Sequence, residues 1–319
     1  MNGTIAIALA MLVLIAAVIL ALLIRFDVGR RADQRWTSDR YPPLKDIGAV
    51  QHLTILPLID MKPARPGLVG EAGVSYLVKA DQTTILFDVG LNRRREHPSP
   101  LVRNMQALGI TLERVHCIVI SHLHADHVGG FANQWKRTFD LSSQPADLGA
   151  IRAFAPTLMT HSTAKVEVVD RPRVIAPGIA TLGPIPRQLF WLGWTPEQSL
   201  AVNVEGKGIV LIVGCGHQTI QRIVQQAEAL LGQPIYGVVG GLHYPVTGLP
   251  VQRFLGVDNW PWKPATQRDV AASITFLQQR HPGLVAISAH DSCDWTIESF
   301  RQAFSQAYQD VLVGKEIIV

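Results

Sequence analysis

Three histidines and an aspartate within six residues constrain this chain more than any other feature. They follow residues 115–120, a continuous apolar run typical of a buried β-strand. The cluster consists of His122, His124, Asp126 and His127, and two glycines come directly after it. Each imidazole and the carboxylate would need a polar partner if buried. The simplest interpretation is therefore a metal site, and the alternative is a solvated histidine-rich loop.

The spacing within this cluster predicts a pair of metal sites. Residues two apart in an extended segment point the same way, so His122 and His124 can bind one ion. Asp126 and His127 are expected at the start of the following helix, where they can turn toward a second ion. The expected cofactors are two divalent metal ions. Nitrogen-rich ligation suits Zn²⁺, while mixed histidine and carboxylate sites also accept iron or manganese.

The remainder of the chain alternates short apolar strands with helices. Residues 74–80 and 84–89 predict a hairpin. Further strands are expected at 53–59, 115–120, 150–154, 166–169, 201–204, 209–213, 236–239 and 284–287, and helices at 98–108, 217–231, 266–280 and 296–309. Such alternation is typical of a layered α/β domain.

Histidines follow three of the later strands. His217 comes after 209–213 in a Gly-Cys-Gly-His sequence, and His243 comes after 236–239 in Gly-Gly-Leu-His. His290 comes after 284–287. The strand ends therefore supply additional candidate ligands, including the thiol of Cys215.

The motif His-x-His-x-Asp-His in residues 122–127 resembles the signature of the metallo-β-lactamase superfamily. The resemblance extends to the hairpin that ends at Asp88 in an Asp-x-Gly sequence. It implies an α/β fold, a four-layer αββα sandwich, for residues 51–319. It also implies that Asp88 is a structural carboxylate behind the ligands, and a simple turn cap is the alternative.

The glycine-rich histidine motifs resemble one branch of that superfamily, named after the dihydropterin ribofuranosylaminobenzene phosphate synthase. That branch also carries a Gly-x-Ile-Pro-Arg stretch, here residues 183–187. The chain departs from it at the last motif, where His290 is followed by aspartate instead of cysteine. Because of this departure, the synthase activity is not assigned to the chain. In a second departure, the position of the superfamily's metal-bridging aspartate falls on Gly214 and Cys215.

The resemblance implies a ligand set and a mechanism. His122, His124 and His217 would hold the first ion, and Asp126, His127 and His290 the second. A metal-activated water would be the nucleophile, which Asp126, the predicted catalytic residue, orients or deprotonates. The roles of Cys215 and His243 stay open. Either Cys215 supplies a soft ligand or water alone bridges the ions, and His217 is preferred to Cys215 as a ligand. His243 is a ligand, a substrate-phosphate contact or a loop histidine.

Residues 4–24 form an uncharged run of 21 residues dominated by Ala, Leu, Ile and Val. A helix of this length spans about 30 Å at about 1.5 Å per residue, so a single transmembrane helix is expected. A cleaved signal peptide is the alternative, but no side-chain charge precedes the run and residues 22–25 make a poor cleavage site.

The segment that follows, residues 25–50, is basic and contains Pro42 and Pro43, and we expect an irregular linker there. Its arginines lie C-terminal to the apolar run. By the positive-inside rule the N-terminus is then outside and the catalytic domain is cytoplasmic. The same arginines can contact anionic lipid, so the bilayer is one expected partner.

Charge and cysteine content restrict the remaining partners. Residues 25–45 hold six of the 29 basic and three of the 25 acidic residues, which leaves a nearly neutral body. No nucleic-acid partner is expected. The cysteines Cys117, Cys215 and Cys293 are far apart, so no disulfide is expected and a reducing compartment fits. Composition says nothing about the oligomeric state.

The function we expect is a membrane-tethered hydrolase of ester-type bonds that acts on a phosphodiester or phosphorylated small molecule. A thioesterase or lactonase with the same site is one alternative, and a metal-binding sensor or assembly protein without turnover is another. Arg93, Arg94 and Arg95 can steer an anionic substrate, or form a solvated run. The loop with Trp260 and Trp262 can cap the site, dip into the bilayer or have no role.

Overall fold

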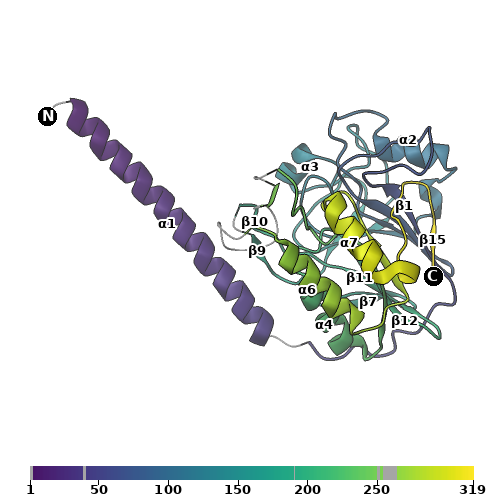
Figure 1. Ribbon diagram of the computed structural model, residues 1–319. Helices are drawn as coiled ribbons and strands as arrows, with labels where there is room; N and C mark the ends of the chain where they lie inside the picture. The colour runs from purple at the N-terminus through teal and green to yellow at the C-terminus, as the bar shows by residue number, and fades with distance from the viewer. Residues whose placement is uncertain (1–2, 39–40, 190, 250–251, 254–263) are drawn as a thin grey trace.

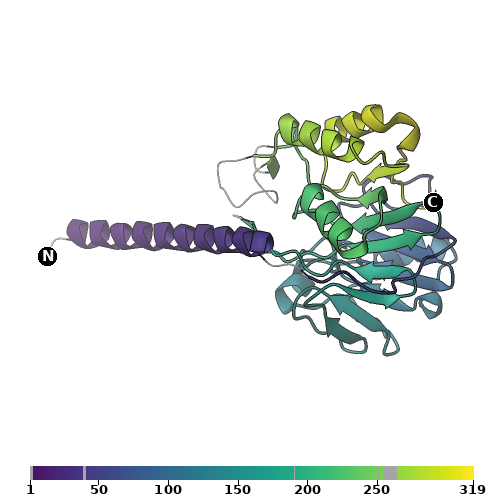
Figure 2. The ribbon, with the colours of Figure 1, turned by 90° about the horizontal axis from the view of Figure 1, so that it is seen from below.

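The computed structural model describes residues 3–38, 41–189, 191–249, 252–253 and 264–319. Two β-sheets pack against each other with helices outside them, and one long helix projects away from this body (Figures 1 and 2). The N-terminus lies at the far end of that helix and the C-terminus on the opposite side of the body. The α/β four-layer sandwich expected from the sequence is confirmed.

The first sheet has the strand order β15-β1-β2-β3-β4-β5-β6. Its strands are β1 (Leu53–Ile59), β2 (Ser75–Ala80), β3 (Thr83–Phe87), β4 (Cys117–Val119), β5 (Arg152–Ala155), β6 (Lys165–Val168) and β15 (Ile317–Ile318). The predicted hairpin is confirmed as β2 and β3, which pair antiparallel with Ala80 opposite Thr83. From β3 to β6 the neighbours are parallel.

The second sheet has the order β14-β13-β12-β11-β8-β7. Its strands are β7 (Arg173–Ala176), β8 (Ile179–Thr181), β11 (Leu200–Val204), β12 (Gly208–Val213), β13 (Ile235–Gly240) and β14 (Leu284–Ile287), and β9 (Gln188–Leu189) and β10 (Gly193–Trp194) form a separate hairpin. Because β12, β13 and β14 run parallel, their carboxyl ends meet at one edge. The histidines that follow these strands share that edge.

Helices cover the outer faces of both sheets. On the first sheet lies α2 (Pro100–Ala107), and on the second lie α4 (Ile220–Leu231), α6 (Gln267–Gln278) and α7 (Asp294–Phe304). The short α3 (Phe131–Lys136) buries none of its residues, and two 3₁₀ turns span Leu112–Arg114 and Ser305–Ala307. Two of these helices, α2 and α6, begin with a side-chain cap. Ser99 accepts a hydrogen bond from the backbone N–H of Val102, and Thr266 and Asp269 form a capping box.

Two expectations about helix starts need correction. Asp126 and His127 lie in consecutive turns, and α3 begins only at Phe131. Gly129 and Gly130 have φ angles of 83° and 115°, which interrupt a helix at this point. Similarly, α4 begins at Ile220 rather than at 217, because Gly216 and Thr219 also adopt positive φ.

The N-terminal helix α1 (Gly3–Ser38) extends well past the predicted end at residue 24. The expected irregular linker therefore starts only beyond Ser38, since no proline or glycine pair interrupts the basic stretch. Residues 41–49 lie on the body, where the N–H of Leu44 donates to the carbonyl of Leu230 at 2.8 Å.

Among the described residues, one helix is long and apolar enough to cross a membrane. It spans Gly3–Trp36, and its most apolar window has a mean hydropathy of 3.3 and no buried residue. A signal sequence meets the same criteria of length and composition.

The core between the two sheets sets the stability of the body. We expect Ile212→Ala, on β12 in that core, to lower the free energy of unfolding by about 2–5 kcal/mol because it leaves a cavity. The control is Ile318→Ala, which is 68% exposed and should cost no more than about 0.5 kcal/mol. Urea unfolding of the full chain in mild detergent measures both, and equal losses would contradict this packing.

Candidate metal centre

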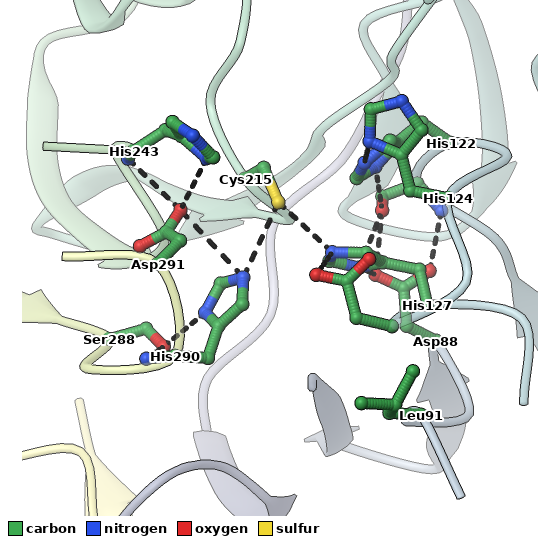
Figure 3. A network of polar contacts seen from close by, with 12 residues as sticks. Asp88, Leu91, His122, His124, His127, Cys215, His243, Ser288, His290 and Asp291 are labelled. Carbon is green, nitrogen blue, oxygen red and sulfur yellow. Dashed lines mark hydrogen bonds and ion pairs between the residues drawn. The ribbon is translucent and has the colours of Figure 1, made fainter. Parts of the chain in front are cut away.

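The sequence-predicted ligands come together at the shared edge of the two sheets (Figure 3). His122, His124, Asp126 and His127 lie in the turns after β4. Cys215 and His217 follow β12, and His243 follows β13. His290 and Asp291 follow β14. Segments far apart in the chain thus meet because four strands end at one place.

The first group of donors surrounds His124. Its Nδ1 lies 2.9 Å from Nε2 of His122 and 3.2 Å from Nε2 of His217. Donor atoms of His122, His217 and Cys215 lie within 4.8 Å of one another. The structure therefore brings together the three histidines that the sequence assigned to the first ion, and adds the thiol.

The second group contains Asp126, His127 and His290, again with Cys215, and these donor atoms also lie within 4.8 Å of one another. The sulfur of Cys215 is 3.1 Å from Nε2 of His127 and 3.4 Å from Nε2 of His290. Figure 3 shows Cys215 in the centre, between these two rings. The thiol thus lies between both groups of donors. In the sequence, it stands at the position where the superfamily has its metal-bridging aspartate.

Asp88 and Ser121 orient two of the rings from behind. The carboxylate of Asp88 accepts hydrogen bonds from the N–H and the hydroxyl of Ser121, at 2.7 and 2.6 Å, and from Nδ1 of His127 at 2.7 Å. Nδ1 of His122 donates to the Ser121 hydroxyl oxygen at 3.0 Å. With both Nδ1 atoms protonated, the Nε2 atoms present lone pairs to the centre. Asp88 thus lies behind the two rings, and the structural role that the superfamily resemblance implies for it stays a prediction.

A second carboxylate and serine pair, which sequence reasoning missed, orients His290. Nδ1 of His290 contacts the Ser288 hydroxyl at 2.6 Å, and that hydroxyl donates to the carboxylate of Asp60 at 2.6 Å. Asp60 also accepts from the Tyr76 hydroxyl at 3.0 Å. Burial raises the pKa of Asp60 to about 6, against the effect of its hydrogen bonds from Ser288 and Met61. Its only sequence signal is its place directly after β1.

Glu197, also missed, holds the loop that carries Cys215 and His217. Its buried carboxylate accepts the backbone N–H groups of Cys215, Gly216 and His217 at 3.0, 2.8 and 3.0 Å. Gly214 lies so close to Ser121 that a side chain there would collide with it, and the carboxylate of Glu197 would be in tight contact. The segment 183–187 contacts Glu197 through the backbone. The N–H of Ile185 donates a hydrogen bond to the backbone carbonyl of Glu197 at 2.9 Å.

Burial keeps most of these imidazoles neutral. Desolvation lowers the pKa of His122 well below its ordinary value, that of His124 to about 4 and that of His290 to about 3. Neutral imidazoles are the form that binds metal ions.

The pKa values of His127 and Asp126 shift in the directions that favour their charged forms. Burial opposes a charge on His127, but Cys215, Asp126 and Asp88 outweigh it and raise its pKa well above the ordinary value. For Asp126, burial is likewise outweighed by His127 and His290, and its pKa is lowered. The centre therefore favours positive charge between these groups, a preference that a divalent cation satisfies with release of the His127 proton.

The thiol of Cys215 and the carboxyl of Asp291 are both fully buried groups whose pKa burial raises well above the ordinary value. An adjacent cation reverses this effect and favours the thiolate and the carboxylate. Sequence reasoning missed Asp291, although it directly follows His290. Its carboxylate accepts the N–H of His243 at 2.9 Å and lies 3.7 Å from Nε2 of His290.

The donors form the floor of an open cleft of about 910 Å³. His124, Asp126, Cys215, His217 and His243 line it, and the His243 ring lies 4.7 Å from that of His217. The loop around Trp260 and Trp262 lies outside the described residues.

Part of the predicted arginine run lies beside the metal cleft. Arg93 and Arg95 line a neighbouring cavity of about 300 Å³. Leu91 and Phe131 line both cavities, so the two adjoin. An anion in the smaller cavity would therefore be close to the metal cleft.

This fold and its histidine-rich sheet edge are similar to those of metallo-β-lactamase-type domains, and comparisons with known proteins find the same similarity. Residues 68–185 match the family model of the metallo-beta-lactamase superfamily. A curated relative, the 7,8-dihydropterin-6-methyl-4-(β-D-ribofuranosyl)-aminobenzene-5′-phosphate synthase of Methanocaldococcus jannaschii, is 26% identical over 242 residues, which are 63% of this chain and 80% of the relative. Residues 68–185 therefore carry the match to the superfamily model, and the curated relative extends the similarity over 242 residues.

Solved structures show the same fold. The protein Tm1679, described as a metal-dependent hydrolase of the beta-lactamase superfamily, aligns with a TM-score of 0.60 and 21% identity, covering 84% of this chain and 99% of its own. Zn²⁺-bound PqqB from Methylobacterium extorquens aligns with a TM-score of 0.52 and 9% identity, covering 83% and 99%. The resemblance expected from the sequence is confirmed.

Asp88 provides a test of the oriented rings. We expect Asp88→Asn to weaken zinc binding about 10- to 100-fold, because the amide cannot accept the hydrogen bonds of Ser121 and His127 as the carboxylate does. Competition with a chelator measures the affinity. Asp170→Asn, at an exposed pair with Arg171, is the matched control. Unchanged affinity in Asp88→Asn would contradict the orienting role.

Proposed function

We propose that this protein is a membrane-tethered, metal-dependent hydrolase of ester-type bonds, with a phosphodiester or related phosphorylated molecule as its substrate. The observation that carries the proposal is the convergence of three donor groups that share Cys215, beside and partly within one open cleft. The description of Tm1679 as a metal-dependent hydrolase and the zinc in PqqB support it. The synthase activity of the Methanocaldococcus jannaschii relative is not assigned, because Asp291 replaces the cysteine of that branch.

The chemistry of the donors fits a pair of divalent ions. His122, His124 and His217 would hold one ion, and Asp126, His127 and His290 the other, with the thiolate of Cys215 shared between them. Lone pairs of several neutral imidazoles point at each other across the centre, an arrangement that a cation stabilises. Imidazole and thiolate donors favour zinc, and iron or manganese are alternatives.

When bound, such a metal pair activates water near neutral pH and polarises the scissile bond. The residues of the chain supply the rest of the mechanism. Asp126 lines the cleft as a carboxylate whose pKa is lowered by His127 and His290, so it is ionised and can orient the attacking water or take its proton. His243 lines the same cleft and is placed to contact a substrate phosphate. No serine or cysteine nucleophile is required.

The N-terminal helix supplies the tether. Residues 4–24 carry no charge, and Arg25, Arg30, Arg31 and Arg35 follow on the same helix. By the positive-inside rule, this order supports an orientation with the N-terminus outside and the hydrolase domain in the cytoplasm.

The metal requirement is tested with His124→Ala. We expect the wild-type chain to hold about two metal ions, as a binuclear mechanism requires, and the variant to lose metal. Turnover of bis-p-nitrophenyl phosphate should fall about 100-fold or more, because several kcal/mol of transition-state stabilisation depend on the ions. Metal content by mass spectrometry is measured beside activity, with the exposed His52→Ala as the control.

Thioester and lactone substrates in the same assay separate the alternative activities. Metal bound without hydrolysis of any substrate would point to the sensor or assembly role. A folded chain that binds no metal would overturn the proposal.

The place of Cys215 is tested by cobalt substitution. A thiolate ligand produces a sulfur-to-cobalt charge-transfer absorption in the near ultraviolet. We expect this band in the wild-type chain and its loss in Cys215→Ser, because the sulfur lies between both donor groups. Cys293→Ser, a thiol outside these groups, should keep the band. A band that persists in Cys215→Ser would exclude the thiolate as a ligand.

A further inference from the structure

Four large apolar side chains project around the mouth of the metal cleft. Phe131 and Trp135 come from α3, and Leu192 and Trp194 from the β9–β10 hairpin, and all four line the cleft. We refer to them as the apolar rim. Trp135 is 90% exposed and Phe131 74%, and both hairpin residues are also exposed. Apolar residues gathered around a cleft mark an interaction site rather than ordinary surface.

The hairpin that forms half of the rim also contacts the N-terminal helix. Strand β9 lies against α1, and the guanidinium of Arg25 lies next to Gly193 in the hairpin. Further along α1, Gly29 and Ala32 are buried against the body. The contact fixes where the end of the apolar segment lies relative to the cleft.

This contact places the rim at the level where the apolar part of α1 ends. The uncharged run stops at Ile24, and the next residue, Arg25, is already beside the hairpin. In Figure 1, β10 and α3 lie on the side of the body that faces back along α1, whereas the C-terminus lies on the far side. If residues 4–24 cross the bilayer, the rim lies at the lipid–water interface, the position that tryptophan prefers in membrane proteins.

The charges nearby suit an anionic amphiphile. Arg25, Arg30, Arg31 and Arg35 follow the apolar run on α1, and Asp27 pairs with Arg30 and Arg31 at 3.1 and 2.7 Å. Basic residues next to a bilayer raise the local concentration of anionic lipid. The cleft itself changes from apolar at the rim to imidazole and carboxylate at the floor. A molecule with a polar head and an apolar chain matches both ends.

We propose that the substrate is an anionic lipid of the bilayer with a phosphodiester head group, which enters the cleft across the apolar rim. The head reaches the floor while the chain stays in the leaflet against Phe131 and Trp135. Water adds to phosphorus, the P–O bond to the alcohol breaks, and the alcohol leaves with the proton from water, so no oxidant or reductant is needed. This inference rests on the proposed hydrolase function and specifies its substrate class.

The activity test uses the full-length chain in nanodiscs that contain phosphatidylglycerol. The double variant Phe131→Ser/Trp135→Ser should lose at least about tenfold in kcat/KM on the phospholipid, because it removes apolar contacts with the chain. Its kcat/KM on the water-soluble bis-p-nitrophenyl phosphate should fall much less, because that diester has no lipid chain to contact the rim. Ile318→Ser, exposed on the side far from α1, should change neither rate.

The placement of the rim is measured without turnover. Lipids brominated near the head-group end of their chains should quench Trp135 fluorescence, identified as the part of the quenched signal that Trp135→Phe removes. An equal loss on both substrates in the double variant would overturn the role of the rim. Hydrolysis of the soluble diester alone, with Trp135 not quenched, would overturn the lipid assignment and leave the hydrolase function standing. Quenching without hydrolysis of either substrate would overturn the hydrolase function and the assigned substrate with it.

Discussion

The fixed orientation of the histidine rings is the constraint on which the rest of this site depends. Asp88 with Ser121, and Asp60 with Ser288, hold the outer nitrogen of the rings so that the inner nitrogen faces the centre. These carboxylates are buried, and a buried carboxylate is tolerated only where hydrogen bonds or opposite charge compensate its desolvation. The polar network behind the rings therefore belongs to the site as much as the donors themselves.

Sheet geometry explains why residues so far apart in the chain meet. Strands β12, β13 and β14 are parallel neighbours, and the segment after each brings a histidine or cysteine to the edge. The turns after β12 and β13 contain glycine. Opposite them, the turns after β4 contribute the other donors. Glu197 then holds the turn of Cys215 and His217 through three backbone hydrogen bonds. The cleft at this edge is also lined by the β9–β10 hairpin, which contacts α1, so the N-terminal helix and the cleft are parts of one arrangement.

The sequence predicted the long, strongly patterned elements and the residues of the cluster, because runs such as β14 and the His-x-His-x-Asp-His motif carry local signals. It did not predict β7 to β10, which are two to four residues long and depend on partners for their conformation. Asp60 and Glu197 were missed for a related reason. Each acts on residues distant in sequence, and nothing local distinguishes either from a surface carboxylate. The turns at Asp126 likewise depend on Gly129 and Gly130 rather than on the helical pattern that follows.

The central claim is that Cys215 and the oriented histidines hold two metal ions at one site. X-ray absorption at the zinc edge of the zinc-loaded, full-length protein measures this most directly. The account predicts nitrogen and oxygen neighbours, a zinc–sulfur distance of about 2.3 Å, and a metal–metal distance of about 3.5–4 Å. A spectrum with one isolated zinc and no sulfur neighbour would contradict it.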